Sequence, residues 1–486
     1  MTKGPLEADE PGVELVVAPD SGAPTEPESY VLQVGRKRVS IISADQRGAI
    51  YGLLTLLELV QRAPNGGNIF LAAKFDDAPD FPFRGVYPVP SYPGAPIGFH
   101  KLIDQMVRLR YNAACFDVDA FKFDVYRDPE KLRRIEDQVA YCRKMGIEPI
   151  PVLQSYGHSS RQLGIDPNIA EGMEVVDEKL VLVGTEPVAL AHPNVIRTES
   201  SDVHITDAAG GRTFMEGHDY EVSGKTEITN WRVGYSSKAP PFKIRRTPGS
   251  RIPDGATVLA GYDYVAHVDK GGNCAYCPNE PRLYRIMGEA IRNTIRTFHP
   301  KYLHIGHDEI SHMGTDSRCR KSGRSNAENL ALEIWRLYRI AKDEDPNIRL
   351  MMWDDMINPY THGRLDNYGP DLNSRPDFQH HRHLIKDPTS PTADLLPRDV
   401  IQNLWFHNRT APLTAGLKSL EFFGKKGPLP EGMRIVPACA AGLWRVSVSR
   451  MRGCPASAFS TRPGPTIITP SRKRRTRPGE FRRARN

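Results

Sequence analysis

The hydrophobic pattern changes along the chain, and its first part predicts a small mixed domain. Short apolar or alternating runs predict three strands, and a longer run with a broad apolar face predicts a helix that follows them. The strands are expected at 13–17, 29–34 and 39–42 and the helix at 48–60. We therefore predict an α+β accessory domain over residues 1–80.

From Arg84 onward, strand-like runs alternate with helix-like runs. Strands are expected at 85–89, 113–118, 146–153, 348–353 and 400–405, and helices at 99–111, 129–145, 281–298 and 326–344. A repeated strand-then-helix order over this length favours a parallel (β/α)8 TIM-type barrel over a doubly wound sheet. The predicted fold class is therefore α/β, with the barrel formed by residues 81–179 and 267–440. It is incomplete at the C-terminus, because no eighth strand and helix are visible after about residue 428.

Residues 180–266 interrupt this alternation with short strands and turn sequences. Strand-like runs at 180–183, 203–205, 220–222 and 257–259 are separated by turn markers such as Ala209-Gly210-Gly211. We predict a β-rich insertion carried on the loop after the third barrel strand.

The net charge of +7 over 486 residues comes from one end of the chain. Residues 445–486 hold twelve Lys or Arg and one Glu, a charge of +11, which leaves −4 for the remainder. Its densest run, Arg472-Lys473-Arg474-Arg475-Thr476-Arg477, could bind nucleic acid or act as a localisation signal, but no aromatic residues are interleaved in it. We predict that residues 441–486 form a disordered basic tail, and that nucleic acid is not a partner.

The cellular compartment is suggested by features that the sequence lacks. It has no long apolar run of membrane-spanning length and no visible secretory signal, so no membrane partner is expected. As given, the chain is predicted to be cytoplasmic, or secreted or periplasmic if its true start lies upstream.

Seven scattered cysteines suggest reduced thiols. The pair Cys274-Ala275-Tyr276-Cys277 could serve zinc or redox chemistry, although a loop with two incidental thiols is the preferred interpretation.

The segment Tyr302-Leu303-His304-Ile305-Gly306-His307-Asp308-Glu309-Ile310 contains the main candidate chemistry. Neighbouring side chains of a strand point to opposite faces, so Asp308 and Glu309 can converge only where the strand stops and the backbone turns. Paired carboxylates at the C-terminal end of a barrel strand suit glycoside cleavage. The alternative is a capped strand end, where one carboxylate serves the N-terminus of the next helix.

Four stretches of the chain resemble glycoside hydrolase family 20, the β-N-acetylhexosaminidases. His304-Ile305-Gly306-His307-Asp308-Glu309 is similar to that family's His-x-Gly-Gly-Asp-Glu signature at the end of the fourth barrel strand. The others are a helix of its accessory domain, the segment that leads into its first barrel strand, and its Pro-Gly-His turn. They correspond here to residues 47–56, 80–85 and 156–159.

This resemblance implies a retaining, substrate-assisted hydrolase that acts on terminal N-acetylhexosamine in a carbohydrate partner, with no cofactor and no catalytic metal. Glu309 would be the general acid and then base, and Asp308 would orient the 2-acetamido group of the sugar. The residues expected to bind the substrate are His158, His304, Trp353, Asp355 and Trp405. For Trp353 and Trp405 the alternative is an ordinary core aromatic residue.

The sequence also departs from the family pattern. Val89-Pro90-Ser91-Tyr92 lacks the arginine that usually follows the first strand, Asp119 is only a stand-in for an Asp-Asp pair, and His307 replaces a glycine. A second hypothesis is therefore a non-catalytic carbohydrate-binding protein on a glycosidase-like barrel. A third, a metal site built from His304, His307, Asp308 and His312, is disfavoured because His304 and His307 would lie on opposite faces of a strand. The oligomeric state is not predicted.

Overall fold

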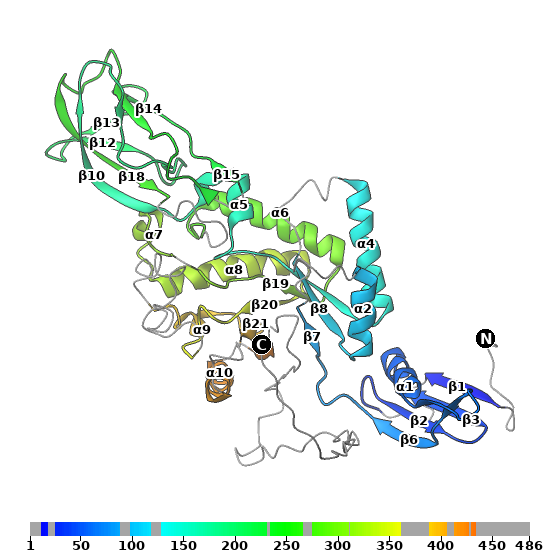
Figure 1. Cartoon of the computed structure of the whole chain (residues 1–486). Coiled ribbons are helices and arrows are strands. Elements are labelled where there is room, and N and C mark those ends of the chain that lie inside the picture. The colour runs from blue at the N-terminus through cyan, green and yellow to red at the C-terminus, as the bar shows by residue number, and fades with distance from the viewer. Residues whose placement is uncertain are drawn as a thin grey trace, which may run out of the picture. The chain divides into compact units, whose positions relative to one another are not determined.

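The structure is a computed structural model of the whole chain, drawn in Figure 1. Among the residues that it describes, no helix is both long enough and apolar enough to cross a membrane. The described residues are 11–17, 25–87, 98–117, 128–230, 234–265, 275–310, 312–360, 388–405, 413–426 and 429–433. The predicted basic tail, Cys274 and Asp119 lie outside these ranges.

A parallel sheet organises the larger part of the molecule, and its strands follow one another in space in the order of the chain (Figure 1). Every neighbouring pair in this sheet is parallel. Its strands are β7 (Gly85–Val86), β8 (Ala113–Asp117), β9 (Glu148–Val152), β19 (Tyr302–His304), β20 (Arg349–Trp353), β21 (Ile401–Trp405) and β22 (Leu429–Met433). Side-by-side strands in sequence order are expected of a (β/α) barrel, because each crossover helix returns the chain to the adjacent position.

The described part of the sheet contains seven strands and does not close on itself. Within the described residues β7 and β22 stay unpaired on their outer sides, so the closed eight-stranded barrel stays a prediction. The sequence pattern showed no strand after about residue 428, yet β22 lies there and is the seventh strand of the sheet. Pro430 and Gly432 conceal this strand in the sequence, since both residues are depleted from strands and Pro is tolerated mainly at an edge.

Helices pack against the sheet, and two long ones lie side by side, α6 (Pro281–Phe298) and α8 (Asn326–Glu344) (Figure 1). Both match their predicted bounds. A capping box between Ser325 and Glu328 starts α8, and Glu280 caps α6 ahead of Pro281. The other helices are α2 (Phe99–Arg108), α4 (Pro129–Lys144), α5 (Ser160–Ile165), the 3₁₀ turn η1 (Pro167–Ile169), α7 (Ser317–Lys321), α9 (Thr392–Leu395) and α10 (Leu413–Lys426).

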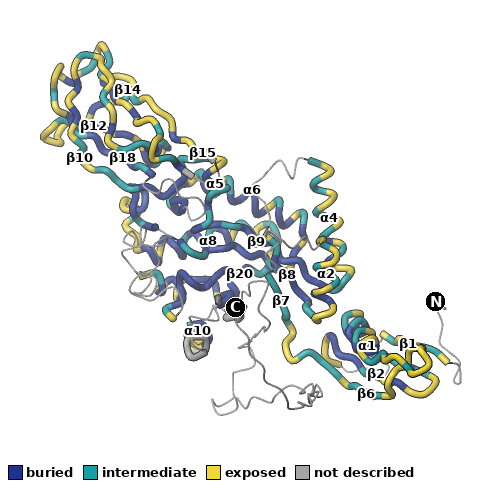
Figure 2. The backbone as a smooth tube through the Cα atoms, viewed as in Figure 1, coloured by how far each residue is buried: buried dark blue, intermediate teal, exposed yellow. Residues whose placement is uncertain are grey.

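Two apolar layers cover the two faces of the sheet. One layer joins strand residues on one face of the sheet, such as Cys115, Ile150, Met351 and Ile401. The other and larger layer joins the opposite face of the strands to α6 and α8. Figure 2 shows the resulting burial of β8, β9 and β20, whose central residues are buried on both faces. Continuous burial explains why the central residues of these strands are apolar instead of alternating with polar ones.

The N-terminal part forms the predicted α+β arrangement. Its sheet has the order β1-β3-β2-β6, and α1 (Gln46–Glu58) packs on it around Leu32, Ile41 and Tyr51. Asp45 caps α1 by accepting the N–H of Gly48. The strands are β1 (Gly12–Val17), β2 (Tyr30–Val34), β3 (Arg38–Ser43) and β6 (Ala73–Asp77), with a separate hairpin of β4 (Val60–Arg62) and β5 (Asn68–Phe70).

The interruption of the barrel pattern is β-rich, as predicted, and has its own apolar core. Its first strand begins at Met173, before the expected boundary at residue 180, and the domain boundaries themselves stay a prediction. Short antiparallel pairs make up the segment. The strands are β10 (Met173–Leu182), β11 (Val188–Ala189), β12 (His204–Asp207), β13 (Thr213–Phe214), β14 (Tyr220–Ser223), β15 (Ile228–Asn230), β16 (Gly234–Tyr235), β17 (Lys243–Arg246) and β18 (Ala256–Tyr264).

A largely buried charge network surrounds Arg84, directly before β7. Its guanidinium pairs with the Glu28 carboxylate and donates to Tyr51 Oη at 2.9 Å and to the Arg110 carbonyl oxygen at 2.7 Å. Asn112 and Arg47 also donate to Glu28, each at 2.9 Å. Glu28 therefore links the N-terminal sheet region to the residues directly before β7 and β8.

We expect Arg84→Met to destabilise the protein by about 3–5 kcal/mol, because it leaves a buried carboxylate without its main partner. Urea unfolding measures the change. Arg245→Met is the matched control: Arg245 and Glu221 form an ion pair whose side chains are 53% and 47% exposed, and its loss should cost less than about 1 kcal/mol. Equal losses in the two variants would contradict a structural role for the Glu28 network.

Candidate active site

The backbone turns sharply immediately after β19. Gly306, His307 and Glu309 all have left-handed backbone conformations, with φ of +73°, +77° and +52°. Such angles are uncommon for residues with a side chain and cluster at functional sites. The turn removes Asp308 and Glu309 from the alternation of the strand, and their carboxylates come together on one side of the loop.

His158 bridges the two carboxylates. Its Nε2 atom lies 3.2 Å from Asp308 Oδ2 and 3.4 Å from Glu309 Oε2. His158 follows β9, the strand that pairs with β19, so the sheet delivers the histidine and the two acids to the same edge. The structure thus brings together three of the residues that the sequence nominated for the site.

Gly157 makes this close approach sterically feasible. Its φ is +107°, and a Cβ atom built on it would lie 1.9 Å from the backbone oxygen of Asp308. Only glycine accommodates both the backbone angle and the neighbouring carbonyl. The glycine of the Tyr156-Gly157-His158 turn therefore sets the distance between the loop after β9 and the loop after β19.

We expect Gly157→Ala to separate these two loops. The predicted result is a loss of stability of about 1–3 kcal/mol, the usual cost of a strained backbone position, together with reduced activity. Thermal unfolding and hydrolysis assays measure the two effects. Gly164→Ala in α5 is the control, because a Cβ there would meet no neighbouring atom within 4 Å. Unchanged stability of Gly157→Ala would contradict the close packing of the loops.

The charges at the site stabilise one another. Burial alone lowers the pKa of His158, but the negative charge of Asp308 and hydrogen bonds to Asp308 and Glu309 raise that pKa well above its ordinary value. Burial raises the pKa of Asp308, and the His158 charge and hydrogen bond outweigh this and lower it. Near neutral pH we therefore expect an imidazolium beside an ionised Asp308.

Asp308 keeps one oxygen free for a further interaction. Its Oδ1 atom is buried and has no hydrogen-bond partner in the described part of the chain. A buried acceptor without a donor costs about 1–3 kcal/mol. A ligand that donates an N–H or O–H to this oxygen would recover that free energy.

Asp355, predicted to bind the substrate, lies beneath the carboxylates in the loop after β20. Its Oδ2 atom accepts the backbone N–H of Glu309 at 2.9 Å, and the residue is fully buried. Burial and the nearby negative charge of Asp308 raise its pKa well above the ordinary value, so we expect it to keep its proton at a pH where an ordinary aspartate is ionised. In this arrangement Asp355 positions the backbone of Glu309.

The raised pKa of Asp355 predicts a pH dependence of stability. The unfolded chain releases this proton above about pH 4, whereas the folded chain retains it, so the free energy of unfolding falls as pH rises through that window. Asp355→Asn keeps an acceptor for the Glu309 N–H and has no proton to lose. We expect the free energy of unfolding of Asp355→Asn, relative to that of the native chain, to rise with pH. The rise should be about 1.4 kcal/mol per pH unit between the pKa of Asp355 in the unfolded chain and its raised pKa in the folded chain. Urea unfolding from pH 4 to pH 8 measures this, and parallel curves would contradict it.

His304 and Trp353 form an inner layer rather than an open wall. His304 is fully buried, its Nδ1 accepts the N–H of Gly306 at 3.0 Å, and burial lowers its pKa to about 3. Its ring packs on Trp353 with the ring centroids 4.5 Å apart, and Trp353 is only 4% exposed in the apolar layer that contains Cys115 and Ile150. These contacts give both residues a packing role, and their contact with a sugar stays a prediction. Trp405 ends β21, and the structure does not describe its side chain.

His307 points away from the acid pair. Its Nε2 atom pairs with the Glu333 carboxylate of α8, and its Nδ1 lies 2.8 Å from the Ile305 carbonyl oxygen. Tyr276 donates to the other Glu333 oxygen at 2.6 Å. The residue that replaces a glycine of the signature is therefore part of a buried polar network. Among the described residues, His304, His307 and His312 do not gather with Asp308 as a group of metal ligands.

Arg161 and Tyr87 were not predicted from the sequence. Arg161 Nη1 lies 3.2 Å from Asp117 Oδ1 at the end of β8, and it follows the His158 turn closely. Tyr87, directly after β7, packs edge-on against Trp353, and burial and the charges of Asp117 and Asp308 raise its pKa. Their places after strands of a predicted barrel were the available signal. Residues 89–92, where the sequence lacks the expected arginine, are not described.

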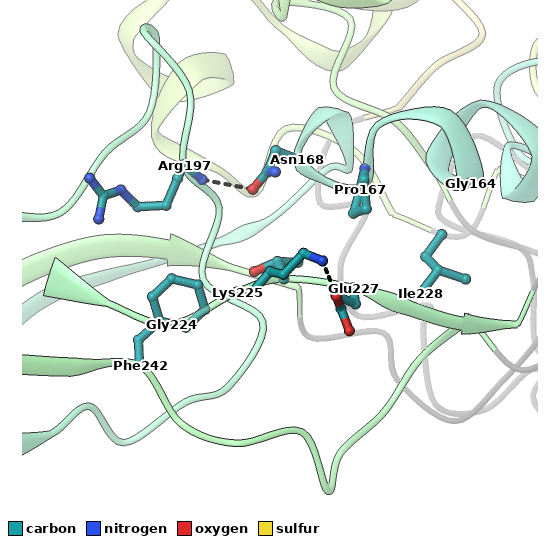
Figure 3. A pocket seen from close by; sticks show the side chains of 10 residues that line it. Gly164, Pro167, Asn168, Arg197, Gly224, Lys225, Glu227, Ile228 and Phe242 are labelled. Atoms are coloured by element: carbon teal, nitrogen blue, oxygen red, sulfur yellow. Dashed lines mark hydrogen bonds and ion pairs between the residues drawn. The ribbon is translucent and has the colours of Figure 1, made fainter.

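A separate cavity of about 700 Å³ lies beside α5 and the β-rich segment. Figure 3 shows Arg197, whose backbone N–H donates to Asn168 Oδ1 at 3.0 Å, and Lys225, which pairs with Glu227. None of the three residues Asp308, Glu309 and His158 lines it. The cavity is therefore distinct from the carboxylate site.

Comparison with known proteins gives similarities to solved glycosidase structures. No family model matches the chain. The Flavobacterium johnsoniae chitobiase of family 20 is 17% identical with a TM-score of 0.49, over 84% of this chain and 46% of that one. The family-20 β-N-acetylhexosaminidase of Streptomyces coelicolor is 12% identical with a TM-score of 0.47, over 87% and 63%. The β-N-acetylhexosaminidase of Bacteroides fragilis is 14% identical with a TM-score of 0.47, over 86% of this chain and 62% of that one. The chain thus spans about half to two thirds of the length of these proteins.

Proposed function

We propose that this chain is a divergent glycoside hydrolase of family-20 type, which removes terminal N-acetylhexosamine by a retaining, substrate-assisted mechanism. One observation carries the proposal. Adjacent Asp308 and Glu309 lie within reach of the same His158 nitrogen, and Asp308 has a buried oxygen that no described residue hydrogen-bonds. The sequence resemblance described above supports the same conclusion.

Asp308 has the properties required to hold an acetamido group. Its lowered pKa keeps it ionised near neutral pH, and its Oδ1 can accept the acetamido N–H. In the proposed reaction the acetamido carbonyl oxygen attacks the anomeric carbon, and the bond to the leaving oxygen breaks. A cyclic oxazolinium ion forms, and the Asp308 charge stabilises it.

Glu309 is the general acid of the first step and the general base of the second. Its side chain is about one quarter exposed, so a substrate can reach it, and the Asp355 contact fixes its backbone. The carboxyl group gives its proton to the leaving oxygen. It then takes a proton from the water that opens the oxazolinium ion, which restores the starting state.

Further side chains at the same sheet edge are candidates for sugar recognition. Arg161 and Asp117 carry charged groups with five N–H donors and two acceptor oxygens between them, and both are partly exposed. They compensate in the proposal for the arginine that is missing from residues 89–92. His158 holds the two carboxylates in position relative to each other.

The test compares two aryl β-glycosides that differ only in the 2-acetamido group. We expect release of the aryl group from the N-acetylglucosaminide and little release from the glucoside, because only the former contains the internal nucleophile. Equal hydrolysis of both would contradict substrate assistance. Binding of N-acetylglucosamine without hydrolysis of either would favour the non-catalytic carbohydrate-binding alternative.

A further inference from the structure

Two cysteines and two carboxylates meet in the interior, outside the site described above. Glu171 precedes β10, Cys277 precedes α6, and Asp316 and Cys319 lie at the start of α7. Their exposed fractions are 0% for the first three and 2% for Cys319. One candidate ligand atom from each residue lies within 4.8 Å of all the others.

Three of the six distances among these atoms match the edges of a tetrahedron around a zinc ion, and the other three are no longer than 4.8 Å. Zn–S bonds of about 2.3 Å and Zn–O bonds of about 2.0 Å give tetrahedral edges of roughly 3.7 Å between sulfurs and 3.5 Å between sulfur and oxygen. The Cys277 and Cys319 sulfurs are 3.6 Å apart. Cys277 Sγ lies 3.5 Å from Asp316 Oδ1, and Cys319 Sγ lies 3.5 Å from Glu171 Oε2.

We propose that Glu171, Cys277, Asp316 and Cys319 form a structural zinc site with four protein ligands. Two thiolates and two carboxylates suit zinc, because magnesium and calcium take oxygen ligands and iron–sulfur clusters take cysteines. Four protein ligands leave no open position, which indicates a structural ion rather than a catalytic one.

The hydrogen bonds around the cluster leave one oxygen of Glu171 and one oxygen of Asp316 facing the two sulfur atoms. Glu171 Oε1 accepts the backbone N–H of Thr315 at 2.7 Å, while Oε2 faces Cys319. Arg318 donates to Asp316 Oδ2 at 2.6 Å and 2.9 Å, while Oδ1 accepts the N–H of Cys319 and faces Cys277. Outer hydrogen bonds of this kind orient metal ligands.

The charge that the four ligands carry when ionised would also suit a divalent cation. Four groups that ionise to anions are buried together, and Glu280 adds a further carboxylate. Arg318 is the cation that pairs with Asp316 and Glu280, and it neutralises only one negative charge. Burial of uncompensated anions is costly, and a divalent ion at the centre would offset that cost.

The zinc site would tie the β-rich segment to the loop of the proposed active site. Glu171 and Thr315 already join the start of β10 to the chain that runs from Glu309 to α7, and His312 Nε2 lies 3.3 Å from the Glu171 carbonyl oxygen. Cys277 lies just before α6. A metal bound to Cys277 as well as to Glu171, Asp316 and Cys319 would therefore fix both segments to the N-terminus of α6. The proposal is independent of the hydrolase function, since it concerns what holds these segments together.

The experiment is elemental analysis of the full chain purified under reducing conditions, with zinc added and the excess removed. We expect about one zinc per chain, and at least a tenfold lower content in Cys277→Ala and Cys319→Ala. Cys142→Ala is the matched control, because Cys142 is equally buried in α4 and belongs to another apolar cluster. It should retain the metal.

A second measurement guards against variants that fail to fold. Cobalt exchanged into the native chain should give the intense visible and near-ultraviolet bands of a tetrahedral site with thiolate ligands. Native chain without stoichiometric zinc after this treatment would overturn the proposal. So would a Cys277–Cys319 disulfide found by mass spectrometry together with absent metal, or zinc that the two alanine variants retain in full.

Discussion

Glu309→Gln is expected to lower kcat for an aryl N-acetylglucosaminide by about two to four orders of magnitude, with folding unchanged. The amide occupies the same volume but cannot donate a proton to the leaving oxygen, and this transfer contributes about 10²–10⁴ to rate. Because Glu309 is partly exposed, the substitution should not disturb the core. Steady-state kinetics and thermal unfolding measure the two quantities.

Two comparisons sharpen this expectation. The loss should be larger for substrates with strongly basic leaving groups than for those with weakly basic ones, because the latter need little protonation. Glu421→Gln, on an exposed side chain of α10, is the control and should behave like the native chain. If Glu309→Gln kept native turnover on both kinds of leaving group, the acid would have to be another residue.

Asp308→Asn should reduce kcat on acetamido substrates by about 10²–10³, the usual cost of losing one electrostatic contact to a charged intermediate. The change removes the negative charge next to the forming oxazolinium ion. It also removes the ion pair with His158, whose nitrogen lies 3.2 Å away. We therefore expect weaker binding of a stable bicyclic analogue of the intermediate, measured by calorimetry.

The matched control for this variant is Asp254→Asn, which changes a carboxylate that is 67% exposed in the β-rich segment. Any residual activity on plain glucosides should fall much less than activity on acetamido substrates, because a glucoside has no group for Asp308 to orient. Equal losses on both substrates would indicate that Asp308 is purely structural.

Local sequence signals determined many of the elements. The apolar face, the proline at the first turn and the capping glutamate predict α6, and the Ser325–Glu328 box predicts α8. Both helices occupy their predicted residues, because the signals are local and strong. β22 was missed because proline and glycine weaken a strand pattern, and its pairing with β21 is a contact between distant segments.

For the carboxylate site, the adjacency of the two acids could be predicted from the sequence, but their geometry could not. Neighbouring Asp308 and Glu309 at a strand end suggested paired chemistry. The left-handed turn, the Gly157 contact and the His158 bridge depend on how the loop after β9 meets the loop after β19. The same reason hid the roles of Asp355, which holds the Glu309 backbone, and of His307, which turns toward Glu333.

By itself, the sequence determined the order of strands and helices, the β-rich interruption and the acid pair, because these follow from residue periodicity and local chemistry. The tertiary structure alone decided which side chains share a space. Glu171, Cys277 and Cys319 are far apart in the chain and carry no common spacing, yet the packing of β10, α6 and α7 brings them together. Burial then sets their chemistry, since a charge inside the protein requires a partner that only the fold can supply.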